Sequence, residues 1–243
     1  MMTTGALALL FTAFSAVHGG DLPPGGTLDA APDPAQLRTG AWRAWLDCEG
    51  HELPFELILH DQPDGWRALI QNGSEELEVD HVTLSGGVVK FEFTQYDAII
   101  EARVLDQGRH LKGTWRRRLG EERWAQLPFE ADWGGGSRFR PRGDAAFPAR
   151  ALDPDQGEGL DGVSRISGSW QVQFDGLEEP AVGLFRSLPG GRAEGTFMTS
   201  TGDYRFLAGD FVAGRLRLSR FDGANAFLVH ATLQADGQRF RPC

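Results

Sequence analysis

The most distinctive polar side chains of this sequence lie close together in its C-terminal third. They combine hydroxyl, carboxylate, phenol and guanidinium groups, and they are Thr199, Thr201, Asp203, Tyr204 and Arg205. Side chains of these types can form a recognition surface at the rim of a β-barrel. They can also be structural, because Gly-Asp at 202–203 is typical of a hairpin turn in which the carboxylate accepts backbone N–H bonds. In that interpretation, which we favour, Tyr204 packs inward.

The tryptophans are the second group of candidate binding residues. Trp42, Trp66, Trp115 and Trp124 fall on stretches with strand-like patterns and could line a barrel that holds a small apolar ligand. Alternatively they fill the interior, because small barrels are packed with side chains. The residue types alone are compatible with both roles, although a core role is the more common one for a buried indole.

Motifs for catalysis or metal binding are absent from the sequence. Residues 47–52 include Asp, Cys, Glu and His, but they form one connection without a second pair of ligands for a tetrahedral metal. There is no Gly-x-Ser-x-Gly, no P-loop and no dinucleotide-binding motif. We therefore predict no catalytic residue, no metal and no cofactor. Cys48 and Cys243, the only cysteines, either form a disulfide, which export would permit, or are unrelated thiols.

Short β-strands are the elements that must position these groups. From Gly40 onward apolar and polar residues alternate with a period of two, as at 55–59 and 100–104. Turn signals such as Asp64-Gly65 and Asn72-Gly73 separate the runs. The pattern predicts an all-β chain whose antiparallel meanders curl into barrels or sandwiches, and the Gly-x-Trp openings are similar to those of lipocalins.

An internal repeat divides the strands into two tandem, related units. Gly-Ala-Trp at 40–42 and Gly-Ser-Trp at 168–170 open the two copies, and matching strands follow at 91–97 and 216–222. A repeat in fixed order indicates duplicated structural units. We place the first unit at 40–132, a Gly/Pro-rich linker at 133–166 and the second unit at 167–243. The first copy continues through Trp115 and Trp124, so we expect the second to lack its closing strands and to expose 226–233 as an open edge.

Composition and the N-terminal segment restrict partners and location. A formal net charge of −10 disfavours nucleic acid and anionic membranes as partners. The apolar run at 6–17 is too short to span a bilayer and has the length of a signal-peptide core. We predict a signal peptide at 1–19, a linker at 20–39 and an exported, periplasmic protein without a membrane span.

Two segments of the second copy resemble a known protein family. Residues 195–209 read Gly-Thr-Phe-Met-Thr-Ser-Thr-Gly-Asp-Tyr-Arg-Phe-Leu-Ala-Gly, and residues 216–228 read Leu-Arg-Leu-Ser-Arg-Phe-Asp-Gly-Ala-Asn-Ala-Phe-Leu. They resemble the β-rich N-terminal region of bacterial exported TlpA-like and peroxiredoxin-related thioredoxin-fold proteins, and the resemblance covers about 40–240.

In that family a thioredoxin-fold domain with a Trp-Cys-x-x-Cys motif follows the β region and performs dithiol–disulfide exchange. No Cys-x-x-Cys occurs in this sequence. The resemblance therefore implies a non-catalytic accessory β region without its catalytic domain. A thioredoxin-fold domain encoded downstream would be its partner.

Overall fold

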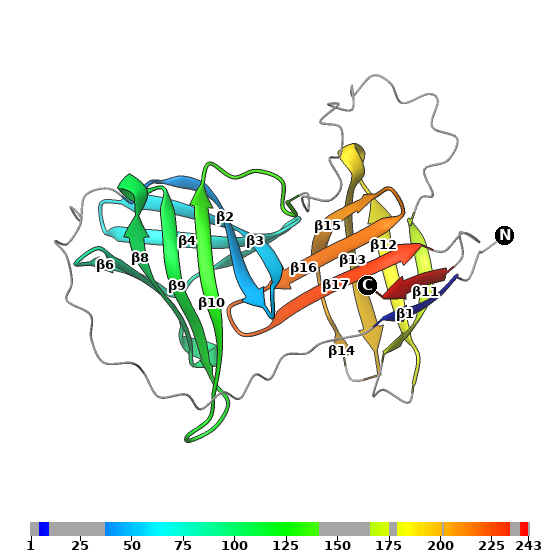
Figure 1. The fold of residues 1–243 in the computed structure, drawn as a ribbon. Coiled ribbons are helices and arrows are strands. Elements are labelled where there is room, and N and C mark those ends of the chain that lie inside the picture. The colour runs from blue at the N-terminus through cyan, green and yellow to red at the C-terminus, as the bar shows by residue number, and fades with distance from the viewer. Residues whose placement is uncertain are drawn as a thin grey trace.

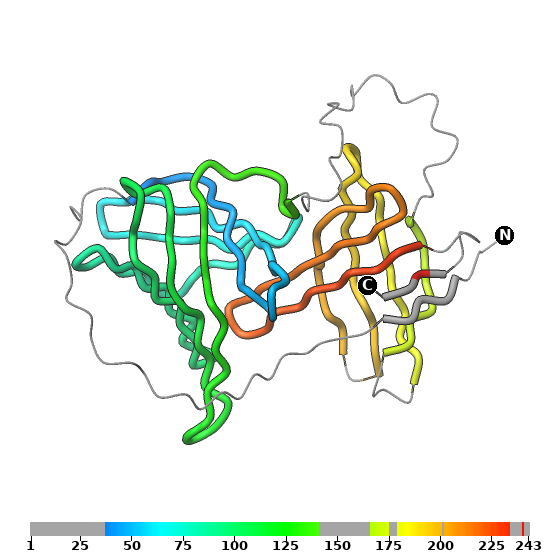
Figure 2. The backbone as a smooth tube through the Cα atoms, viewed as in Figure 1, coloured from blue at the N-terminus to red at the C-terminus, as the bar shows by residue number. Residues whose placement is uncertain are grey.

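The chain forms two curled antiparallel sheets, which are seen beside each other in Figure 1 and Figure 2. The computed structural model describes residues 5–9, 37–140, 166–174, 179–200, 202–233 and 239–242. The predicted all-β class with two tandem barrel-like units is confirmed. Most of the predicted signal peptide, of the 20–39 linker and of the 133–166 linker lies outside the described residues. None of the described helices is long and apolar enough to cross a membrane.

The first unit is a nine-stranded sheet in the order β5-β4-β3-β2-β10-β9-β8-β7-β6. Its strands are β2 (Gly40–Cys48), β3 (His51–Gln62), β4 (Gly65–Asn72), β5 (Glu75–Glu78), β6 (His81–Ser85), β7 (Val88–Phe93), β8 (Ala98–Leu105), β9 (His110–Arg118) and β10 (Trp124–Trp133). The last strand, β10, returns to pair with the first, β2, in antiparallel orientation. The meander is thereby curled into a barrel with a seam between β5 and β6.

The core of the first unit follows directly from the period-two pattern. On β7, Val89, Phe91 and Phe93 are buried, whereas Lys90 and Glu92 between them are partly exposed. Successive side chains of a strand point to opposite faces of the sheet, so a single alternating run supplies one inner and one outer face. Each large apolar side chain buried in this way contributes roughly 1.5–3 kcal/mol.

The second unit is built from the strands after residue 166, together with one strand from the N-terminus. Its strands are β11 (Gly168–Phe174), β12 (Ala181–Ser187), β13 (Arg192–Thr199), β14 (Gly202–Asp203), β15 (Leu207–Val212), β16 (Arg215–Phe221), β17 (Ala226–Leu233), β18 (Arg239–Pro242) and β1 (Gly5–Leu9). The order is β12-β11-β1-β18-β17-β16-β15-β13-β14, and β12 also pairs with β13. Strand pairing is therefore continuous around this unit.

The two units begin with the same local structure, as the repeat predicts. Gly40 and Gly168 have φ angles of 98° and 133°, which glycine adopts readily. The tryptophan two residues later donates its indole N–H to the carbonyl four residues before it, at 3.0 Å for Trp42 and 2.9 Å for Trp170. The eight strands from β2 through β9 of the first unit correspond, in the same order, to the eight strands from β11 through β18 of the second.

Strand β10 has no counterpart after β18 in the described part of the chain. Its place between β11 and β18 is taken by β1, which is parallel to both neighbours. The expectation of an open edge at 226–233 is wrong. Strand β17 pairs with β16 on one side and with β18 on the other. The expectation failed because the short run at 239–242 is long enough to form a ladder with β17.

Candidate functional site

A hairpin of the second unit enters the first unit and joins the two. Strands β16 and β17 extend toward β2 and β3 of the first unit (Figure 1). Phe221, at the end of β16, is fully buried and belongs to the core of the first unit. Its ring centroid lies 4.5 Å from that of Phe55 and 6.0 Å from those of Phe93 and Trp115. Such aromatic pairs contribute about 0.5–1.5 kcal/mol beyond the burial of their area.

Side chains of the first unit also bind the backbone of this hairpin. The fully buried Asn72 donates its side-chain N–H to the carbonyl of Phe221 at 2.8 Å and accepts the N–H of Phe221 at 3.2 Å. The indole N–H of Trp115 donates to the carbonyl of Gly223 at 2.8 Å. Buried backbone groups need partners, and here the partners fix the hairpin against the first unit.

Arg138, which follows β10, lies between the units and completes the joint. Its guanidinium donates to the hydroxyl and carbonyl oxygens of Ser219 at 2.9 and 3.1 Å, to Asn72 Oδ1 at 3.1 Å and to the carbonyl of Gln71 at 3.3 Å. None of these acceptors is a carboxylate. Burial lowers the pKa of Arg138 to about 10, because its charge lies away from water. The side chain is therefore a partly buried cation whose side-chain hydrogen bonds go to neutral groups, while the charge of Glu56 favours its protonated form.

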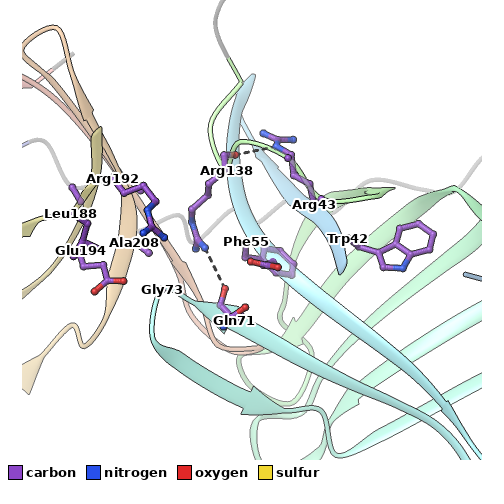
Figure 3. Close-up of a pocket in the computed structure, with 15 residues that line it drawn as sticks. Trp42, Arg43, Phe55, Gln71, Gly73, Arg138, Leu188, Arg192, Glu194 and Ala208 are labelled. Atoms are coloured by element: carbon purple, nitrogen blue, oxygen red, sulfur yellow. Dashed lines mark hydrogen bonds between the residues drawn. The ribbon is translucent and has the colours of Figure 1, made fainter. Parts of the chain in front are cut away.

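A cavity of about 260 Å³ lies beside Arg138, between the two units. Figure 3 shows Arg138 directed toward Gln71, with Arg192 and Glu194 of the second unit on the opposite side. The indole of Trp42 points away from this space (Figure 3). This cavity thus lies beside Arg138, whose hydrogen bonds join the units, and it is lined by residues of both.

A larger cavity, of about 410 Å³, lies on the other side of the hairpin and is called here the joint cavity. Its lining comes from both units and consists of Leu77, Glu78, Asp80, Phe93, Gln95, Tyr96, Asp203, Tyr204, Arg205, Arg220, Asp222, Asn225 and Phe227. Both aromatic and charged residues contribute to it. Three residues of the polar cluster singled out in the sequence therefore meet residues of the first unit in one hollow.

Carboxylates outnumber guanidinium groups in the joint cavity. Arg220 is held by Asp222 at 2.6 Å and by Glu75 at 3.2 Å, so its charge is neutralised locally. Burial opposes ionisation of Asp222, but bonds from Asn225 and Arg220 outweigh it and hold the pKa below its usual range. The hydroxyl of Thr94 likewise lowers the pKa of Asp80. Both carboxylates are ionised at neutral pH. The charge of Asp222 balances that of Arg220, and Glu78 is paired with Arg67, so the negative charge of the lining comes from Asp80 and Asp203 and is partly offset by Arg205.

Asp203 and Thr199 of the predicted polar cluster form local hydrogen bonds. Asp203 accepts bonds from the hydroxyl of Thr196 at 3.2 Å and from the backbone N–H of Arg205. It lies with Gly202 on β14, which pairs with Met198 and Thr199 of β13. Thr199 donates its hydroxyl to the carbonyl of Gly202 at 2.9 Å. Thr201 is outside the described residues.

Tyr204 connects the cluster to the core of the second unit. Its ring centroid lies 4.9 Å from that of Phe227 and 5.9 Å from that of Phe174. The side chain is partly exposed and also lines the joint cavity. Part of the Tyr204 side chain therefore packs against the core of the second unit, and another part borders the joint cavity.

The four candidate tryptophans do not share one environment. Trp42 and Trp115 are buried in the first core, Trp66 packs against that core, and Trp124 is 46% exposed beside Arg118. Of the four, only Trp42 contributes to either cavity described above. The two tryptophans in the core thus fill the barrel, and Trp115 also contacts the hairpin.

Sequence reasoning missed the residues that form the joint, namely Asn72, Arg138 and Phe221. For Phe221 the repeat offers a clue, because Phe221-Asp222 in the second copy corresponds to Tyr96-Asp97 in the first. In the structure Tyr96 is 45% exposed, whereas Phe221 is fully buried in the other unit. Equivalent aromatic positions therefore have different roles in the two copies.

Comparison of the chain with family models, curated proteins and solved structures finds no match. Within the described ranges, no three His, Cys, Asp or Glu side chains are grouped so that they could hold a metal ion. The joint between the units and its cavity are therefore the features of the fold that point to a function.

The thiol of Cys48 is free and buried at the end of β2. Burial raises its pKa from about 9 to about 12, and the carboxylates of Asp47 and Glu49 add to the shift. A thiol with this pKa stays protonated at neutral pH and is a poor nucleophile. Its contribution to stability is complete below pH 9 and is lost as the pH rises toward 12, because the unfolded chain loses the proton first.

We expect Cys48 to resist a maleimide at pH 8 in the folded chain. The measurement uses a Cys243→Ser variant, in which Cys48 is the only thiol, and follows labelling by mass spectrometry. The same variant in guanidinium chloride is the control and should label completely. Labelling of the folded variant at the rate of a free thiol would contradict the burial of this side chain.

Proposed function

We propose that this chain is a non-catalytic binding module that takes a small organic cation with apolar groups in the joint cavity. The observation that carries the proposal is the combination of aromatic rings and an excess of carboxylates in one hollow formed by both units. Aromatic faces attract cations, and each such contact is worth about 0.5–2 kcal/mol. Pockets that combine apolar walls with a few polar groups are the usual form of small-molecule sites.

Two features of the cavity support this class of ligand. Tyr96 is 45% exposed, so part of its ring is accessible from solvent. The carboxylates of Asp80 and Asp203 accept bonds from neutral groups, so neither is neutralised by a guanidinium through the bonds described here. A quaternary ammonium group therefore meets both an aromatic surface and negative charge.

Calorimetric titration of the full chain with tetramethylammonium and choline tests the proposal. The neutral isostere 3,3-dimethylbutanol distinguishes attraction of the charge from simple apolar binding. We expect Tyr96→Leu to weaken binding of choline about fivefold, which corresponds to the loss of about 1 kcal/mol. Trp124→Leu is the matched control, because Trp124 is an equally exposed aromatic residue away from the cavity. Equal affinity for the neutral isostere, or equal effects of the two substitutions, would refute the proposal.

The resemblance supplies a second candidate function, that of an accessory region of an exported thioredoxin-like redox protein. What supports it is the resemblance of residues 195–209 and 216–228 to the β-rich region of that family. An insulin-reduction assay tests this candidate. We expect the chain alone to be inactive, and activity that disappears in Cys48→Ala would contradict it.

A further inference from the structure

The slot between β11 and β18 has the geometry of a place for an antiparallel strand. In the first unit the equivalent strands are β2 and β9, and β10 lies antiparallel between them. In the second unit β11 and β18 are both parallel to β1, so they run in the same direction as each other. One strand can therefore be antiparallel to both, as β10 is in the first unit.

In the structure β1 occupies this slot, and it pairs with only part of β11 and of β18. Strand β1 pairs with β11 along Gly5–Leu9 but with β18 only at Ala6 and Leu7. By contrast, β10 pairs with β9 along Trp124–Asp132 and with β2 along Phe129–Trp133. Parallel pairing is also slightly less stable per residue than antiparallel pairing. A strand with the direction and length of β10 would therefore form longer ladders than β1 does.

The core beneath the slot is apolar. Trp170 of β11 and Phe240 of β18 are buried on the two sides, with ring centroids 4.9 Å apart. In the first unit β10 supplies its inward side chains at alternate positions, through Ala125, Leu127 and Phe129. Gln126 and Pro128, which lie between them, are exposed. The same alternation of inward and outward side chains suits a strand in the slot between β11 and β18.

We propose that the slot between β11 and β18 is a strand-acceptor site for an extended segment of a partner chain. The segment runs antiparallel to β11 and carries the apolar alternation of β10. It replaces β1 and pairs with both edges through backbone hydrogen bonds, while its alternate apolar side chains pack against the core that contains Trp170 and Phe240. Addition of a strand to an exposed sheet edge is a recurring mode of peptide recognition.

The test uses the full chain with Leu7→Pro, because proline removes a backbone N–H at the centre of β1. Thr4→Pro, just before this strand, is the matched control. The probe is a fluorescein-labelled peptide with the sequence of residues 124–133, and its binding is measured by anisotropy. A peptide of the same composition without alternation is the control for sequence pattern.

We expect Leu7→Pro to bind the 124–133 peptide at least tenfold more tightly than the wild-type chain or Thr4→Pro does. The control peptide should show no binding to Leu7→Pro. A folded Leu7→Pro chain that binds neither peptide, or both equally, overturns the proposal. Dimerisation of Leu7→Pro without peptide also overturns it, because a second copy would then fill the slot. If Leu7→Pro folds only when the 124–133 peptide is present, that rescue supports the proposal, and failure to fold with either peptide overturns it.

Discussion

Phe221→Ala is expected to lower the free energy of unfolding by about 3–5 kcal/mol, the range for truncation of a fully buried aromatic side chain. The ring belongs to the core of the first unit although the residue is part of the second. Its removal leaves a hollow bordered by Phe55, Phe93 and Trp115. The loss should also separate the two units energetically, because this ring is their main apolar link.

Urea unfolding followed by tryptophan fluorescence and by circular dichroism measures both effects. We expect one transition for the wild-type chain and two separated transitions for Phe221→Ala. Phe206→Ala is the matched control, because Phe206 is 52% exposed and its truncation should change stability by less than about 0.5 kcal/mol. A single unshifted transition for Phe221→Ala would show that the hairpin is not anchored by this ring.

Asn72→Ala is expected to cost about 2–4 kcal/mol, because it leaves several buried polar groups without partners. The amide of Asn72 satisfies both the N–H and the carbonyl of Phe221, and its oxygen also accepts a bond from Arg138. Water cannot replace these bonds easily, since the side chain is fully buried. The cost should exceed that of an ordinary surface substitution by a wide margin.

The neighbouring residue on β4 provides the control for this prediction. Gln71→Ala removes a side chain that bonds only to the exposed Glu76 in the hydrogen bonds described, so it should change stability little. Urea midpoints of the two variants give the comparison. The double variant Asn72→Ala with Phe221→Ala should lose less than the sum of the single effects, because both residues act on one contact. Strict additivity would indicate that the two residues stabilise the protein independently.

The strands and the repeat could be predicted because each is encoded locally. Alternation of apolar and polar residues is a property of a single strand, and Gly-x-Trp marks the start of both units. The same reasoning failed at the end of β16, where Ser219, Arg220 and Phe221 are buried in succession. Alternation breaks down there because the first unit covers the face that would otherwise meet solvent.

The joint could not be predicted because its residues have ordinary local contexts. Arg138 lies in a stretch rich in glycine and proline, which indicates a linker, and nothing in the residue type indicates a cation bonded to both units. Asn72 precedes a glycine and is typical of a turn. For the tryptophans, a single sequence cannot separate core from ligand site, because both require the same apolar side chain.

The hairpin that completes the first core has a consequence for synthesis on the ribosome. Trp133, the last residue of the first sheet, emerges well before Phe221, which follows roughly 90 residues later. At ordinary translation rates this interval lasts about 5–20 s. During that time the nascent first unit lacks the ring that completes its core, so the apolar walls at Phe55 and Trp115 are accessible to chaperones and to other nascent chains. The order of the two units along the chain thus makes the final folding step of the first depend on the folding of the second.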